Sequence, residues 1–106
     1  MIEKVKTFIH QNINKNLTLL SAAEHISMNP NYLSVLFKQT TGQNFINYVI
    51  NQRMELAKQL LMEDNLKLYE ITEEVGYQSS KHFTKLFKKT VGMLPSDFRR
   101  SKTIEH

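Results

Sequence analysis

The stretch HFTKLFKKTVG occupies residues 82–92, and a near copy, YLSVLFKQTTG, occupies residues 32–42. Leucine, phenylalanine, lysine, threonine and glycine fall at the same five places in both copies. A repeat of this kind predicts one structural unit that is used twice. The sequence is therefore interpreted as two copies of a small unit, and its function should be one that needs both.

Apolar residues around both copies recur with the period of an α-helix, and no run alternates with the period of a strand. The predicted fold class is all-α, with about seven helices. Thr18, Asn29 and Asn44 are expected to cap helices at their N-termini, and Pro30 takes a first helical position. Gly42 is expected to end the helix that begins at Pro30.

Each copy belongs to a short helix, a tight turn and a longer helix, over about residues 18–41 and 67–90. This order of elements is typical of the helix-turn-helix motif, although helical hairpins with other functions share it. Seven residues lead from Ile26 to Leu33, whereas eight lead from Val75 to Phe83. The second turn is therefore predicted to be one residue longer than the first.

A long helix is predicted after Asn44, and its eighteen residues would extend for about 27 Å. A last short helix is expected from Pro95 to Arg100. The predicted organisation is a first helix-turn-helix subdomain at 1–43, a linker helix at 44–63, a second helix-turn-helix subdomain at 64–101 and a flexible tail at 102–106.

The composition excludes several classes of protein. The 106 residues are 41% apolar and 23% charged, and they include no cysteine. A disulfide framework and a thiolate metal site are thereby excluded. The start of the sequence lacks the apolar core of a signal peptide, and no segment is apolar over the length that crosses a membrane. A cytoplasmic protein without cofactor, metal site or membrane partner is predicted.

The charge is concentrated on the second copy. The chain carries a formal charge of +4 and has a pI of about 9.4. No acidic residue occurs between Val75 and Ser96, a stretch that contains four lysines: Lys81, Lys85, Lys88 and Lys89. A solvated lysine face and a surface for an acidic partner both fit this cluster.

The outward faces of the two longer helices carry side chains that can recognise DNA. In the first helix they are Asn31, Ser34, Val35 and Lys38, and in the second Lys81, Thr84, Lys85 and Lys88. Asparagine suits an adenine edge, lysine a guanine edge, serine and threonine either partner, and valine a thymine methyl group. The candidates for phosphate contacts are Lys38, His82, Lys88 and Lys89. A merely solvated face remains the alternative, above all at Ser34 and Val35.

Two such helices in one chain could lie in successive major grooves, about 34 Å apart on one face of a duplex. One chain would then do what a dimeric repressor does with two subunits. Its binding site need not be palindromic.

The sequence resembles the AraC/XylS family of transcription regulators. The segment EITEEVGYQSSKHFTKLFKKTVGMLPSDFRR, residues 70–100, carries the family-like VGY, HF, FKK, G, P and FR in order. NPNYLSVLFKQTTG, followed by Arg53, Ala57 and the leucine pair at 60–61, resembles the first half of the module. The likeness covers about residues 2–100. It implies two helix-turn-helix subdomains bridged by a long helix.

The resemblance also implies site residues. The base-facing positions of the first recognition helix would be Asn31, Ser34 and Val35, and those of the second Ser80, Lys81, Thr84 and Lys85. Many members have arginine where this chain has Val35 or Lys85, so bidentate reading of guanine is not expected there. Lys67 and Leu94 also depart from the usual helix-capping residues, which concerns stability more than function.

The family likeness implies an activator that binds double-stranded promoter DNA, with RNA polymerase as a further candidate partner. Members usually carry the module behind a sensor or receiver domain, which would lie outside this chain. The segment KLYEITEEVGYQS is most similar to response regulators of Gram-positive bacteria.

Two other classes of function explain the sequence less well than DNA binding does. A helical interaction domain that docks its basic face on an acidic protein explains the charge but not the duplicated faces. An enzyme is not expected, because the histidines are scattered without an HExxH pair and the three glycines are too far apart for a phosphate-binding loop.

Overall fold

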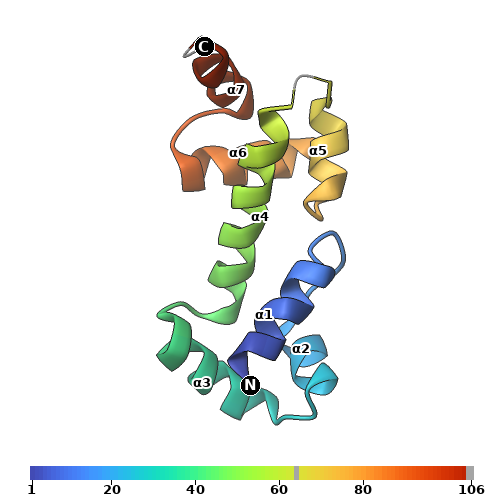
Figure 1. The fold of residues 1–106 in the computed structure, drawn as a ribbon, viewed down its shortest axis with the longest axis vertical. Coiled ribbons are helices and arrows are strands. Elements are labelled where there is room, and N and C mark those ends of the chain that lie inside the picture. Colours follow the sequence, from blue (N-terminus) through green and yellow to red (C-terminus); the bar gives the residue numbers. More distant parts are fainter. Residues whose placement is uncertain (64, 105–106) are drawn as a thin grey trace. The chain divides into compact units, whose positions relative to one another are not determined.

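The computed structural model describes residues 1–63 and 65–104, of which 102–104 are described by their backbone. The described residues form seven helices and no strand, so the prediction of an all-α fold is confirmed (Figure 1). In chain order the helices are α1 (Ile2–Gln11), α2 (Leu19–His25), α3 (Pro30–Thr41), α4 (Phe45–Leu61), α5 (Leu68–Glu74), α6 (Ser80–Val91) and α7 (Pro95–Ile104).

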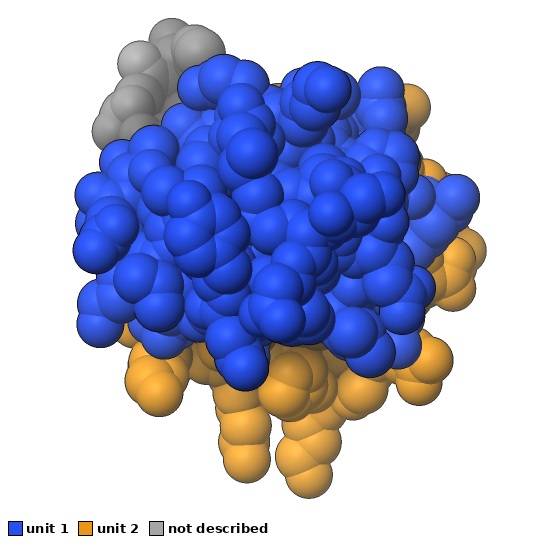
Figure 2. Space-filling view, turned by 90° about the horizontal axis from the view of Figure 1, so that it is seen from below, with its two compact units in different colours: residues 1–52 blue, residues 53–106 orange. Residues whose placement is uncertain are grey.

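The chain forms two compact units, residues 1–52 and residues 53–106, which Figure 2 distinguishes by colour. The core of the first unit gathers apolar side chains of α1, α2, α3 and the start of α4. Its fully buried members include Ile9, Leu33 and Phe37. Phe37 meets Phe45 and Tyr48 edge-on, with ring centroids 5.7 and 5.1 Å apart. These contacts hold α3 against the beginning of α4.

Local signals begin and end the first unit's helices as expected. The Thr18 hydroxyl accepts the Ser21 N–H at 3.0 Å and so caps α2. Pro30 stands at the first position of α3, and Gly42 ends that helix with φ of 80°. Asn44 Oδ1 accepts the Asn47 N–H at 2.8 Å at the start of α4. The predicted caps of these three helices are therefore confirmed.

The second unit repeats this plan. Phe83 and Phe87 of α6 are fully buried, at the places that Leu33 and Phe37 take in α3. Phe87 lies 5.8 Å from Phe98 of α7, again nearly edge-on. An aromatic contact thus fixes α4 against α3 in the first unit, and another fixes α7 against α6 in the second.

The two turns differ by one residue, as predicted. Residues 26–29 separate α2 from α3, whereas residues 75–79 separate α5 from α6. Both turns begin alike, because the Met28 N–H donates to the Ala23 carbonyl at 2.9 Å and the Tyr77 N–H to the Thr72 carbonyl at 3.0 Å. The left-handed residue is Gly76 in the second turn but Ser27, with φ of 55°, in the first.

Helix α4 supplies buried side chains in both units. Phe45 and Val49 join the core of the first unit, and Met54, Ala57 and Leu61 are buried farther along the helix. The boundary between the units falls inside this helix, after Gln52. The separate status of residues 44–63 as a linker stays a prediction.

The last helix is longer than expected. It continues through Ile104 instead of ending at Arg100, because no glycine or proline follows to stop it. Residues 102–104 of the predicted tail thus belong to α7, and residues 105 and 106 lie outside the described residues, so the flexibility of the tail stays a prediction.

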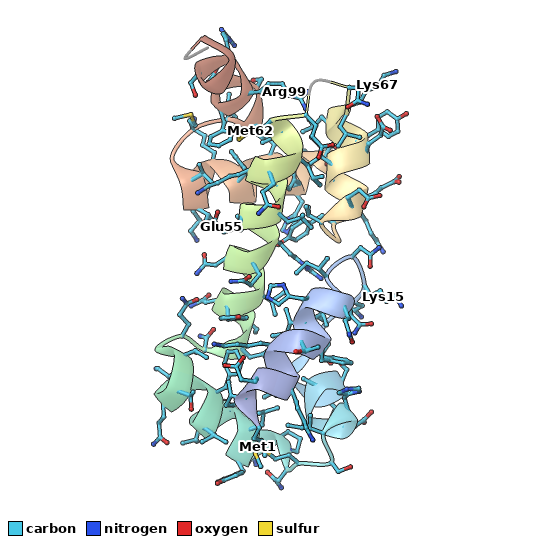
Figure 3. The ribbon with its side chains drawn as sticks, in the orientation of Figure 1. Met1, Lys15, Glu55, Met62, Lys67 and Arg99 are labelled. Carbon is cyan, nitrogen blue, oxygen red and sulfur yellow. The ribbon has the colours of Figure 1, made fainter. Side chains whose placement is uncertain are left out.

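Arg99 of α7 holds the end of α4. Its Nε donates to the Leu61 carbonyl at 2.7 Å and its Nη2 to the Glu63 carbonyl at 3.0 Å (Figure 3). The last carbonyls of a helix have no partner within the helix. A guanidinium on α7 therefore replaces the missing partners and fixes the path of the chain after α4.

Candidate nucleic-acid interface

Helix α3 presents an outward face with little charge. Leu33 and Phe37 are fully buried on its inner side. The four side chains that the sequence predicts for the outward face are all exposed: Asn31, Ser34, Val35 and Lys38. The only ionisable cation of α3 is Lys38, so this face offers amide, hydroxyl and apolar groups more than positive charge.

The first turn of α3 is fixed by its cap. Asn29 Oδ1 accepts the backbone N–H groups of Asn31 at 2.8 Å and of Tyr32 at 3.2 Å. These donors would otherwise lack partners at the start of the helix. The cap thus orients the turn that carries Asn31, the part of a recognition helix that reaches base edges.

Helix α6 presents a strongly basic face. Phe83 and Phe87 are buried, and the exposed side chains include Lys81, His82, Lys85, Lys88 and Lys89. The helix contains no acidic residue. Several cations on one face attract a polyanion and would release its counterions on binding. Five of the predicted site residues are therefore gathered on one exposed surface.

Thr84 lies at the edge of this face, whereas Ser80, the first residue of α6, lies nearer its buried side, and both are half-buried. The Ser80 hydroxyl lies 3.1 Å from the Thr72 hydroxyl of α5. Thr84 lines a groove of about 280 Å³ together with Leu61, Leu94 and other residues of the second unit. Ser80 and Thr84, both predicted base contacts, therefore each lie against other residues of the second unit.

The start of α6 is set by its own cap and by an aromatic neighbour. Ser79 Oγ accepts the His82 N–H at 3.2 Å. The His82 ring lies 5.6 Å from the ring of Tyr77, over which the Arg53 guanidinium is placed at 5.1 Å. Burial raises the pKa of the Tyr77 hydroxyl, and the nearby Arg53 partly offsets this shift. Tyr77 is therefore neutral at physiological pH.

Tyr32 is a candidate that the sequence reasoning missed. It is 59% exposed on the first turn of α3, at the place that His82 takes in α6. The sequence does carry a signal, because an alignment of the two copies places Tyr32 opposite His82, a predicted phosphate contact. Tyr32 belongs to the same exposed surface as Asn31 and Val35.

Within residues 1–63 and 65–104, no helix is long and apolar enough to cross a membrane. Nor do these ranges hold a group of three or more histidine, aspartate or glutamate side chains that could bind a metal ion.

Comparison with known proteins agrees with this geometry. A family model described as a helix-turn-helix domain matches residues 22–101. The transcriptional regulatory protein YesN of Bacillus subtilis (strain 168) is 45% identical over 92 residues, which are 84% of this chain and 25% of YesN. The arabinose operon regulatory protein of Escherichia coli (strain K12) is 33% identical over 84 residues, 79% of this chain and 29% of that protein.

A solved structure shares both fold and sequence. It is the C-terminal domain of AraT, a response regulator from Geobacillus stearothermophilus, with a TM-score of 0.91 and 37% identity over 94% of this chain and 84% of that one. The duplicated helix-turn-helix units, the family match and these relatives agree with the resemblance seen in the sequence. The chain belongs to the helix-turn-helix domain family, as an AraC-type DNA-binding domain of a transcription regulator.

Proposed function

We propose that this domain binds double-stranded DNA in a sequence-specific way, with α3 and α6 as its two recognition helices. The basic face of α6 is the observation that carries the proposal. It places four lysines and a histidine on an exposed surface without an acidic residue, at the same register as the outward face of α3. Such a surface suits the phosphates that flank a major groove.

The two helices divide the work of recognition. Asn31, Ser34 and Val35 of α3 read base edges with amide, hydroxyl and apolar groups. On α6 the base-reading residues are Lys81, Lys85 and, from the edge of the face, Thr84. The phosphate contacts come from Lys38, His82, Lys88 and Lys89. Ser80 has a positioning role, because its hydroxyl already bonds Thr72 within the unit.

Both helices enter major grooves, on successive turns of one duplex. Helix α4, which lies between the two motifs in the chain, has 17 residues and a length of about 26 Å. Successive major grooves on one face of B-DNA are about 34 Å apart, a distance of the same order. The DNA site would therefore contain two half-sites that need not be related by symmetry.

The domain acts as part of a larger regulator in the cytoplasm, where promoter DNA is found. The chain spans 25% of YesN and 29% of the arabinose operon regulatory protein. A sensor or receiver domain ahead of the DNA-binding domain would control binding, as the likeness to the C-terminal domain of a response regulator supports. At a promoter the bound protein activates transcription through RNA polymerase. No catalytic role is proposed.

Selection of bound duplexes from a random pool at physiological salt tests the proposal. We expect an enriched motif with two blocks of information about one helical turn apart. A single block would restrict base reading to one helix. Binding that is sensitive to salt but enriches no motif would contradict sequence-specific recognition and favour a basic face that serves an acidic protein.

A further inference from the structure

Val35 stands at the centre of the outward face of α3. At about 100° per residue, it lies about 180° from the midpoint between Leu33 and Phe37, which form the buried side. Its side chain is 57% exposed. Val35 is the sixth of the twelve residues of α3, so it belongs to the half of the helix that follows the cap. No position on α3 is better placed to face a ligand in a groove.

A second apolar side chain lies beside Val35. Tyr32, three residues earlier, is 59% exposed and therefore shares this part of the surface. The polar side chains of Asn31, Lys38 and Gln39 are exposed around the pair. Tyr32 and Val35 form a small apolar patch with a polar rim, which we call the α3 patch.

The fold does not require the α3 patch. Helices α3 and α6 share the same plan, with twelve residues, two large buried apolar side chains and a glycine after the last residue. Yet the positions of α6 that correspond to Tyr32 and Val35 hold His82 and Lys85. Valine also has a lower helix propensity than lysine or arginine. Val35 is thus favoured neither by the core nor by the helix, which points to a contact outside the protein.

We infer that α3 recognises the C5 methyl groups of thymines through Val35, with Tyr32 as a second contact. This inference rests on the proposed function. In the major groove the thymine methyl is the apolar feature of the base pairs, and an apolar side chain is its natural partner. The amide of Asn31, one turn earlier, suits the adenine edge. The half-site read by α3 should therefore be rich in A·T pairs, with at least one thymine pressed against Val35.

Replacement of thymine by deoxyuridine tests this contact, because it removes only the methyl group. Each thymine of a selected duplex is replaced singly, and the dissociation constant is measured by fluorescence anisotropy. We expect one or two positions in one half-site to weaken binding by the wild-type protein roughly fourfold, the value for one buried methyl group. At the thymine that Val35 contacts, the replacement should leave binding by Val35→Ala unchanged within error, whereas a thymine that Tyr32 contacts should keep its effect in this variant.

Two further variants control the experiment. Val35→Thr keeps one γ-methyl group and should keep part of the sensitivity to deoxyuridine. Lys85→Ala removes a base contact on α6 and should keep all of it. Folding of each variant is checked by circular dichroism, which an exposed site should leave unaltered.

The outcomes separate this inference from the function on which it rests. If no duplex is enriched in the selection, the proposed function fails and the inference fails with it. If a motif is enriched but no deoxyuridine weakens binding, or if the weakening persists in Val35→Ala at every sensitive position, the inference alone is overturned. Loss of the effect in Val35→Ala but not in Lys85→Ala assigns thymine recognition to α3.

Discussion

The hydroxyl oxygens of Thr72 and Ser80 lie 3.1 Å apart across the second turn. Thr72 is buried and donates its single hydroxyl proton to the Leu68 carbonyl at 2.8 Å. Ser80 must therefore be the donor in the bond between the two hydroxyls. The first unit has Ala23 and Pro30 at these places and makes no such bond. The longer turn is thus held by a polar contact that the shorter one lacks.

Ser80→Ala should lower the free energy of unfolding by about 1 kcal/mol, because one hydrogen bond is lost while Thr72 keeps its bond to Leu68. Urea unfolding measures this loss, and Ser34→Ala, at an exposed hydroxyl on α3, should cost much less. Affinity for a selected duplex should change little in Ser80→Ala. Unchanged stability with weaker specific binding would instead make Ser80 a base contact, as the family resemblance implies.

Lys85→Ala and Lys89→Ala should weaken DNA binding in different ways. Loss of a base contact at Lys85 should cost about 1–3 kcal/mol on a selected duplex and little on random DNA. Loss of a phosphate contact at Lys89 should weaken both duplexes alike and reduce the slope of log K against log salt by about 1. Titrations at several salt concentrations measure both. Equal losses on both duplexes in Lys85→Ala would contradict its role.

Arg99 and Arg100 form a matched pair on α7. Arg99→Lys should destabilise the second unit by about 1–2 kcal/mol, because a lysine cannot bond the Leu61 and Glu63 carbonyls with a planar fork. Arg100→Lys should cost less than about 0.5 kcal/mol, since the interaction of Arg100 among the described residues is an exposed ion pair with Asp97 at 3.0 Å. Thermal unfolding compares the two, and equal losses would show that the end of α4 does not depend on Arg99.

Ser27 and Gly76 allow a reciprocal exchange at the left-handed position of each turn. Ser27 has φ of 55° and Gly76 φ of 94°. A side chain is strained in this region, whereas glycine adopts it readily at some cost in unfolded-state entropy. Ser27→Gly should stabilise the protein by about 0.5 kcal/mol, and Gly76→Ser should destabilise it by about 1 kcal/mol or more. Urea unfolding tests both signs, and stabilisation by Gly76→Ser would refute the argument.

Tyr77 should make stability fall at alkaline pH. Burial raises the pKa of its hydroxyl, so the unfolded chain releases this proton at lower pH than the folded protein does. The stabilisation is complete below pH of about 10, the pKa in the unfolded chain, and is lost as pH rises through the folded pKa. Tyr77→Phe should therefore show a shallower loss of unfolding free energy between about pH 9 and 11.

At neutral pH the same variant should be as stable as the wild type or slightly more so. The buried Tyr77 hydroxyl makes no hydrogen bond of ordinary geometry among the described residues, and its favourable interaction with the nearby Arg53 offsets only part of the cost of burial. Urea unfolding at several pH values measures both effects. An identical alkaline decline in the two proteins would exclude Tyr77 as its source.

Much of the fold could be predicted from the sequence, because its signals are local. The caps at Thr18, Asn29 and Asn44 and the glycine at the end of α3 act on residues next to them. The buried stripe of α3 follows from periodicity alone. For the same reason the outward positions of Val35 and Lys85 were correctly predicted, although their contacts with bases stay a prediction.

Other features depend on partners that are distant in sequence or on the direction of one side chain. Arg99 bonds a carbonyl 38 residues earlier, which no local pattern indicates. The family resemblance implies a base-facing Ser80 but cannot show that its hydroxyl turns toward Thr72. Met54 is buried in α4 although its neighbours in sequence are charged, because the helix changes from one core to the other near this point.

Because α4 belongs partly to each unit, the protein cannot be divided into two intact units, although its sequence is duplicated. A cut after Gln52 would follow the boundary between the units, yet it would leave two frayed helix ends in place of one continuous helix. A fragment meant to keep one unit intact must retain the whole of α4, so the minimal fragments, 1–61 and 45–104, overlap by seventeen residues. Neither unit can be lost, exchanged or inherited without part of the other.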